Sequence, residues 1–158
     1  MVKKSSGHSP AVIFVPVTAA HLPVLSAWFD APAVRSRIAV DDFDAYYRTV
    51  SKQENYYLYS VFDGEALVAL VMAEILENRA AAALIVDPAR TGHGIGTNTL
   101  LALTANAHTL FGEVASIDAC IEPDHTASIR CFENGGFTCV GTDEYGLYIY
   151  RHECRQRG

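Results

Sequence analysis

The sequence lacks the features that mark several large classes of protein. No apolar run approaches the roughly 20 residues that a membrane-spanning helix needs. The short apolar run after Lys4 is interrupted by Pro16, which argues against a signal peptide. The four cysteines include no C-x-x-C pair, so neither a zinc ribbon nor a disulfide scaffold is indicated. We expect a protein of the reducing cytoplasm that binds no metal.

Positive charge is also scarce. Lys and Arg number 12 against 18 Asp and Glu, which gives a formal net charge of −6, and no lysine follows Lys52. The one basic cluster is at the C-terminus, at Arg151, Arg155 and Arg157. Because nucleic-acid contacts need clustered Lys and Arg, we predict no nucleic-acid partner, and the missing membrane span predicts no membrane partner.

The chain has the size and apolar content of one domain. It has 158 residues, of which 50% are hydrophobic, enough for a core of its own. We predict a disordered start at 1–10, a single domain at 11–152 and a C-terminal tail at 153–158.

Hydrophobic periodicity predicts a mixed α/β (α+β) fold. Alternating or continuous apolar runs predict strands at 12–17, 56–62, 66–76, 80–86, 116–121, 137–141 and 147–152. Helical spacing predicts helices that end near Phe29, Val50, Gly112 and Glu133. The order is β-α-α-β-β-β-α-β-α-β-β, a mostly antiparallel sheet of six to seven strands with about four helices and one parallel pair.

The segment 86–97, VDPARTGHGIGT, joins a predicted strand to a predicted helix through three alternating glycines. Glycines let backbone N–H groups face an anion, and the helix adds its positive end. A dinucleotide loop would need glycine where Thr97 stands, and a Walker loop would need a lysine. The segment therefore predicts a phosphate site of another kind.

This segment and the later segment 127–137, ASIRCFENGGF, together resemble the GNAT superfamily of acyl-CoA-dependent N-acetyltransferases. That family's late helix is commonly written A-x-x-Y-E-K-x-G-F, and the element order is similar over 11–152. The resemblance implies acetyl-CoA as cosubstrate, with its pyrophosphate on backbone N–H groups of 91–96 and its pantetheine arm between strands 80–86 and 116–121.

The resemblance also implies which residues bind the cofactor, in the strand, the glycine loop and the late helix. They are Ile85, Val86, Thr91, Gly92, His93, Gly94, Ile95, Gly96, Thr97, His125, Ser128 and Phe132. Three of them depart from the family pattern. Thr91 replaces the usual Arg or Gln, His125 replaces Asn, and Phe132 replaces a frequent general-acid Tyr. We therefore expect backbone amides to carry most of the pyrophosphate binding.

The general base is expected outside the strand that usually carries it. Strand 80–86 has no carboxylate, although many relatives place Glu or Asp there. Glu74 shares a face with Leu70 and Met72 in strand 66–76, so we expect it to be partly buried and predict it as the catalytic base. A purely structural role for this carboxylate stays open.

The leading interpretation is direct transfer of an acetyl group from acetyl-CoA to a primary amine of a small molecule. The early helices carry acidic and aromatic residues, including Asp42, Asp44 and Trp28. They would suit a cationic amine, or the acids would stabilise helix N-termini and the aromatic rings would pack in the core. Trp28 and the segment 129–133 also look like aminoglycoside-type acetyltransferases. The alternatives are acetylation of a protein N-terminus or lysine, and an acyl-CoA-binding module without catalysis. The resemblance further suggests a homodimer through the last strands.

Overall fold

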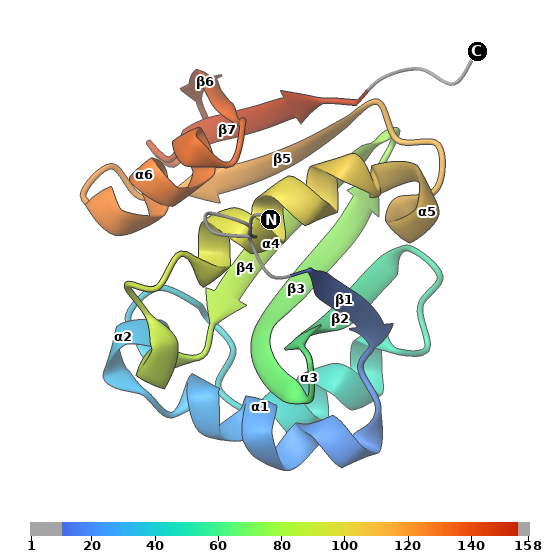
Figure 1. The fold of residues 1–158 in the computed structure, drawn as a ribbon. Coiled ribbons are helices and arrows are strands. Elements are labelled where there is room, and N and C mark those ends of the chain that lie inside the picture. Colours follow the sequence, from blue (N-terminus) through green and yellow to red (C-terminus); the bar gives the residue numbers. More distant parts are fainter. Residues whose placement is uncertain (1–10, 155–158) are drawn as a thin grey trace, which may run out of the picture.

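A seven-stranded mixed sheet organises the structure, a computed structural model that describes residues 11–154 (Figure 1). Its order is β1-β2-β3-β4-β5-β7-β6. The strands are β1 (Val12–Pro16), β2 (Tyr56–Asp63), β3 (Ala66–Leu76), β4 (Arg79–Val86), β5 (Ser116–Ile121), β6 (Thr138–Thr142) and β7 (Tyr148–Glu153). The predicted start at 1–10 and residues 155–158 of the predicted tail lie outside the described residues.

All neighbouring strands pair antiparallel except β4 and β5, which are parallel. The predicted fold class is thereby confirmed, with its antiparallel meander of β2, β3 and β4 and its one parallel pair. The hairpin between β2 and β3 turns at Gly64 and Glu65, and Gly64 has a φ of +62°.

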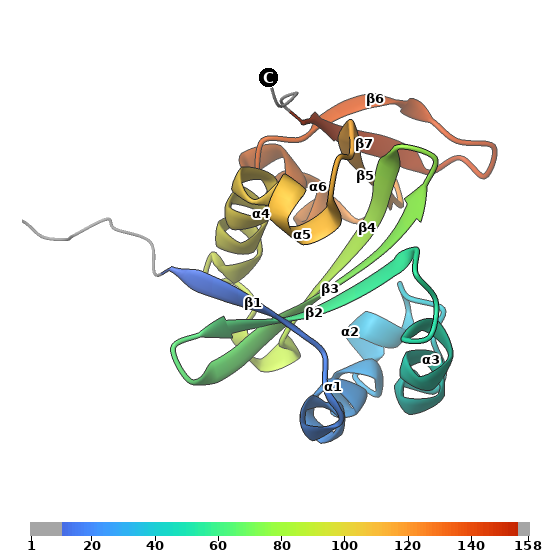
Figure 2. The same ribbon diagram turned by 90° about the vertical axis from the view of Figure 1, so that its right-hand side faces the viewer.

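Helices cover the two faces of the sheet as separate groups (Figure 2). On one face are α1 (Leu22–Phe29), α2 (Pro32–Arg35) and α3 (Phe43–Val50), and on the other are α4 (Ile95–Ala105), α5 (Ala107–Phe111) and α6 (Thr126–Asn134). Short 3₁₀ turns lie at Ala19–His21 and Pro88–Arg90. Each group has its own core because β3 is buried on both sides, with Leu70 and Met72 toward α1–α3 and Val71 and Ala73 toward α4–α6.

The described residues form six α-helices where about four were predicted. Pro32 begins the additional short helix α2 at a position where a missing N–H costs nothing. Asn106 divides the predicted long helix into α4 and α5, because its backbone leaves the helical region and its side-chain Nδ2 donates to the Ala102 carbonyl at 2.8 Å. Leu100, Leu103 and Leu110 are nevertheless all buried.

The parallel pair opens as a wedge. β4 and β5 are in register only at Arg79–Ser116, Ala80–Ile117 and Ala81–Asp118. Beyond these pairs β4 continues beside β3 alone, and β5 continues beside β7 alone. We call the opening between residues 82–86 and 119–121 the wedge. It widens toward the carboxyl ends of both strands, where ligands of open α/β sheets bind.

Candidate functional site

The loop that follows β4 is shaped by its own side chains. The Asp87 Oδ1 accepts a hydrogen bond from the Ala89 N–H at 2.9 Å, and Pro88 begins the 3₁₀ turn. The Arg90 Nε lies 3.2 Å from the Asp87 Oδ2, so the charge of this guanidinium is already paired. Asp87 therefore acts as a turn residue, and the loop is held at the wide end of the wedge.

Two glycines bring the backbone of this loop to the start of α4. Gly92 and Gly94 have φ values of +85° and +79°, a conformation that side chains disfavour. Gly94 is the N-cap of α4 and supplies no side chain to cap it. The N–H groups of Ile95, Gly96 and Thr97 consequently have no side-chain cap, which is the arrangement that binds phosphate at helix N-termini.

The side chains around these amides add little charge. Thr91 and His93 are exposed, Ile95 is half-buried, and Thr91 has extended backbone geometry. The sequence predicted that backbone amides bind the phosphate, because Thr91 stands where the family has Arg or Gln. This stays a prediction, and the lack of charged side chains around the amides favours it.

Close packing of α4 on α6 fixes the other side of the site. A Cβ at Gly96 would lie 2.7 Å from the Cys131 Sγ, 3.5 Å from the Val86 Cγ2 and 3.7 Å from the Leu84 Cδ2. The Thr97 hydroxyl donates to the Cys131 Sγ at 3.9 Å. The start of α4 is therefore pressed between β4 and α6.

Three predicted cofactor residues belong to α6 and have different surroundings. His125 is the N-cap residue and is half-buried, as is Ser128 one turn later. Phe132 is 5% exposed, and its ring packs edge-on against Phe137 with centroids 5.1 Å apart. This part of α6 offers polar groups at its start and, at the end of its second turn, a buried ring that has no ionisable proton.

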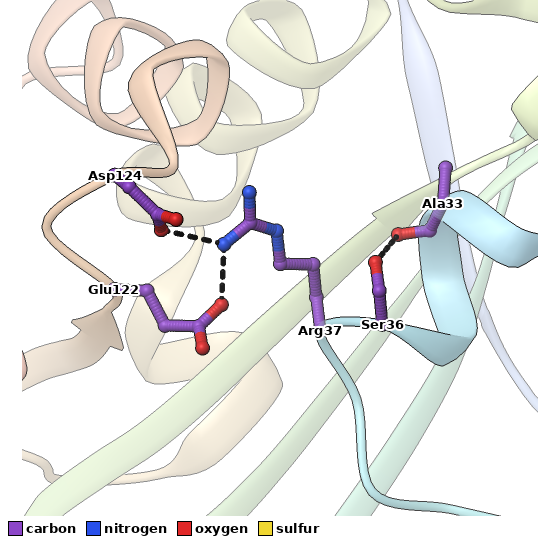
Figure 3. Close-up of polar contacts among 5 residues, drawn as sticks. All are labelled: Ala33, Ser36, Arg37, Glu122 and Asp124. Atoms are coloured by element: carbon purple, nitrogen blue, oxygen red, sulfur yellow. Dashed lines mark hydrogen bonds and ion pairs between the residues drawn. The ribbon is translucent and has the colours of Figure 1, made fainter.

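Arg37 connects the two helix groups across the mouth of the wedge (Figure 3). It lies between α2 and α3, and its Nη1 lies 2.5 Å from the Glu122 Oε1 and 2.8 Å from the Asp124 Oδ1, just after β5. The hydrogen bonds to Glu122 and Asp124 raise the pKa of Arg37, and the guanidinium lowers the pKa of Asp124. Burial, followed by the charge of Arg37, lowers the pKa of His125. Sequence reasoning missed this arginine, since 85 residues separate it from Glu122.

Glu74 lies one strand away from the point where the wedge begins. It is half-buried and pairs in register with Ala81, the last β4 residue that pairs with β5. Ile85 is 5% exposed and packs in the α1–α3 core, while Val86 is half-buried and pairs with Ala69. The predicted base thus lies on β3, next to the strand that carries the two predicted cofactor residues.

A second carboxylate near this point is fully engaged. The Asp118 Oδ1 and Oδ2 each accept a hydrogen bond from Arg151 at 2.9 Å, and the Ser116 hydroxyl donates to the Oδ1 at 3.0 Å. Such a bidentate pair fixes the orientation of the carboxylate. Both oxygens of Asp118 are therefore already taken by hydrogen-bond donors.

The acidic and aromatic residues of the early helices mainly hold those helices together. The Asp42 Oδ1 caps α3 by accepting from the Ala45 N–H at 3.1 Å. The Asp44 carboxylate accepts a hydrogen bond from the Ser26 hydroxyl of α1, and Trp28 is 6% exposed. These contacts give the residues structural roles, and a cationic acceptor stays a prediction.

Residues 11–154 lack the features of two other classes of protein, those that hold a metal ion in a cluster of side chains and those that cross a membrane by a helix. No group of three His, Cys, Asp or Glu side chains in this range is placed to hold a metal ion. Within the same range, none of the helices combines the length and the apolar character that crossing a membrane requires.

Comparison with known proteins gives consistent matches. The acetyltransferase (GNAT) domain family matches residues 11–138. The uncharacterized N-acetyltransferase YfmK of Bacillus subtilis (strain 168) is 31% identical over 123 residues, which are 77% of this chain and 82% of the relative.

Two solved structures share the fold. The aminoglycoside acetyltransferase AAC(6')-Ib in complex with coenzyme A and kanamycin has a TM-score of 0.76 at 20% identity, covering 90% of this chain and 95% of that one. The spermidine N-acetyltransferase from Vibrio cholerae with CoA and spermine has a TM-score of 0.73 at 14% identity, covering 89% and 92%.

Proposed function

Because the chain belongs to the GNAT acetyltransferase family, we propose that it transfers the acetyl group of acetyl-CoA directly to a primary amine of a small molecule. The observation that carries this proposal is the wedge, which ends at an uncapped helix N-terminus. The structural neighbours that bind kanamycin and spermine with CoA support a small-molecule amine as the acceptor.

The wedge suits an extended thioester arm. On the β5 side of residues 82–86, no strand that the structure describes covers the backbone N–H and C=O groups. The pantetheine amides can therefore form hydrogen bonds there as an added strand does. From Val86 back to Ala82 the strand spans about 13 Å, at roughly 3.3 Å per residue. With the pyrophosphate at Gly92 to Thr97, the thioester then lies beside Ala81 and Ala82. His125 and Ser128 face the arm from α6.

The reaction needs one deprotonation before the bond forms. An amine with an ordinary pKa of about 10.4 is protonated at pH 7, whereas a thiol with a pKa of about 8.5 leaves as thiolate more readily. Glu74 takes the amine proton, and the neutral nitrogen attacks the thioester carbon. A backbone N–H of β4 stabilises the oxyanion, the C–S bond breaks, and the nitrogen loses its second proton to solvent. Solvent protonates the CoA thiolate and takes the first proton back from Glu74. Phe132 has no proton to give.

Thiol release across a panel of amines tests the proposal. Polyamines, aminoglycosides, amino acids and peptides are offered with acetyl-CoA, and release above the hydrolysis rate is expected for at least one small amine. Release on peptides alone would assign the chain to protein acetylation. A rise in melting temperature with acetyl-CoA, but thiol release with none of the acceptors, would favour an acyl-CoA-binding module without catalysis. Two features support that alternative: Phe132 cannot donate a proton, and β4 has no carboxylate.

The role of Glu74 has its own test. Glu74→Gln should lower kcat at least tenfold and leave the Kd for acetyl-CoA unchanged. Ala81 is exposed and lies opposite Glu74 in register, so Ala81→Glu added to Glu74→Gln should restore part of the rate. Asp118→Asn is the matched control and should keep kcat per folded molecule.

The location and the assembly of the protein belong to the same proposal. We place it in the cytoplasm, where acetyl-CoA and reduced cysteines are both found. All five residues of β6 are exposed at the edge of the sheet, which favours a homodimer through that strand. Light scattering at several protein concentrations distinguishes a dimer from a monomer.

A further inference from the structure

One row of register partners crosses six strands on a single face of the sheet. Tyr56 of β2 pairs with Glu74 of β3, Glu74 with Ala81 of β4, and Ala81 with Asp118 of β5. The row continues from Asp118 to Arg151 of β7 and from there to Thr138 of β6. Paired residues of neighbouring strands share a face and lie about 4.8 Å apart. This row therefore places ionisable groups on both sides of Ala81.

Ala81 is a gap in this row. It belongs to a central strand, yet it is exposed, so no larger side chain covers it. It is also the residue at which β4 and β5 part. A reacting amine that approaches from the face of Glu74 meets the wedge here, with Glu74 on one side and the Asp118–Arg151 pair on the other.

Glu74 is bordered by phenol groups on the side away from the gap. Burial, followed by a hydrogen bond to Glu74, raises the pKa of Tyr56. Burial, followed by the charges of Tyr56 and Glu74, raises the pKa of Tyr46 on α3. A phenol whose pKa is raised keeps its proton at neutral and mildly alkaline pH, so Tyr56 stays a hydrogen-bond donor over the range in which the amine reacts.

We propose that Tyr56 is a positioning residue for the transfer, and that its hydroxyl holds the Glu74 carboxylate beside the exposed Ala81. The inference rests on the proposed function, because it needs Glu74 as the base. A flexible glutamate without this donor would adopt several rotamers, and only some of them face the gap. The carboxylate opposite, Asp118, needs no such aid because Arg151 holds it.

Tyr56→Phe tests the inference, because it removes one oxygen and keeps the ring. We expect kcat to fall about tenfold, as for the loss of a hydrogen bond to a charged group, while the Kd for acetyl-CoA is unchanged. Tyr57→Phe is the matched control and should change neither, because Tyr57 stacks on Tyr59 on the opposite face.

The variants separate this inference from the proposed function. If Glu74→Gln loses turnover but Tyr56→Phe keeps the wild-type kcat, the positioning role is overturned while the base stands. If Glu74→Gln itself keeps full turnover, the base assignment fails first. In the Glu74→Gln background, Tyr56→Phe should have no further effect on kcat. A full additional tenfold loss there would show that Tyr56 acts through general stability, which also overturns the inference.

Discussion

Gly96 on α4 stands so close to Cys131 on α6 that an added Cβ would lie 2.7 Å from the sulfur atom. This contact sets how near α4 can come to α6, and Gly96 itself supplies one of the amides proposed to bind pyrophosphate. A larger residue at Gly96 must therefore move α4 or turn the Cys131 side chain.

Gly96→Ala should destabilise the protein by about 1–3 kcal/mol through overpacking, and it should weaken acetyl-CoA binding. Thermal unfolding and titration calorimetry measure the two effects. Cys131→Ala removes the obstructing sulfur, so the double variant should regain most of the lost affinity. If affinity stays low in the double variant, the Cys131 contact is not the cause.

Gly94→Ala should weaken acetyl-CoA binding through the backbone alone. At a φ of +79° an alanine costs about 1–2 kcal/mol, and relief of that strain would turn the α4 amides away from the ligand. Gly112→Ala is the matched control, since Gly112 has a φ of +81° at the C-terminal end of α5, beyond the opposite end of α4 from Gly94. It should lower stability similarly and leave the Kd unchanged. Equal losses of affinity in both variants would contradict a specific role for Gly94.

Arg37→Ala should raise the pKa of His125. After burial, the charge of Arg37 is the largest cause that lowers this pKa, and Glu122 and Asp124 both raise it. Removing the guanidinium leaves only burial to lower the value. Histidine NMR titration of both proteins measures the change, with His108 as an internal control. A His125 pKa that falls or stays constant would show that the Arg37 contact is absent in solution.

Thr99→Val should stabilise the protein. Among the residues that the structure describes, the Thr99 Oγ1 is a buried hydroxyl without a hydrogen-bond partner, and the residue is 0% exposed. An unsatisfied buried polar group costs about 1–3 kcal/mol, and valine replaces the hydroxyl by a methyl group of similar shape. Melting temperature is the measurement. A decrease would indicate that the hydroxyl has a partner in solution.

Local signals in the sequence were sufficient for most of the fold. The strand 66–76 was predicted with the bounds that the structure has, because a long apolar run lies between two turn signals. The glycine loop was predicted from its alternating glycines together with the later segment 127–137, and two of these glycines have positive φ values. In contrast, the break at Asn106 depends on one side-chain hydrogen bond that competes with the helix. The spacing of hydrophobic residues does not reveal such a bond.

The parts of the site that depend on register could not be predicted. Glu74 was chosen from its strand pattern, but its position opposite Ala81 and beside Tyr56 depends on how three strands align. Arg37 reaches Glu122 only through the tertiary fold. The local sequence of 36–41, SRIAVD, matches no turn or site motif, so no pattern marks this arginine.

The wedge also gives the protein two sheet edges in its interior. Residues 82–86 and 119–121 present rows of backbone donors and acceptors with no strand of residues 11–154 between them, like the outer edge strands on which other chains add. In the proposed function, the pantetheine arm of acetyl-CoA fills this place in the sheet. On that proposal an unliganded copy keeps two unpaired strand edges to which other chains can add, and bound acetyl-CoA prevents such association.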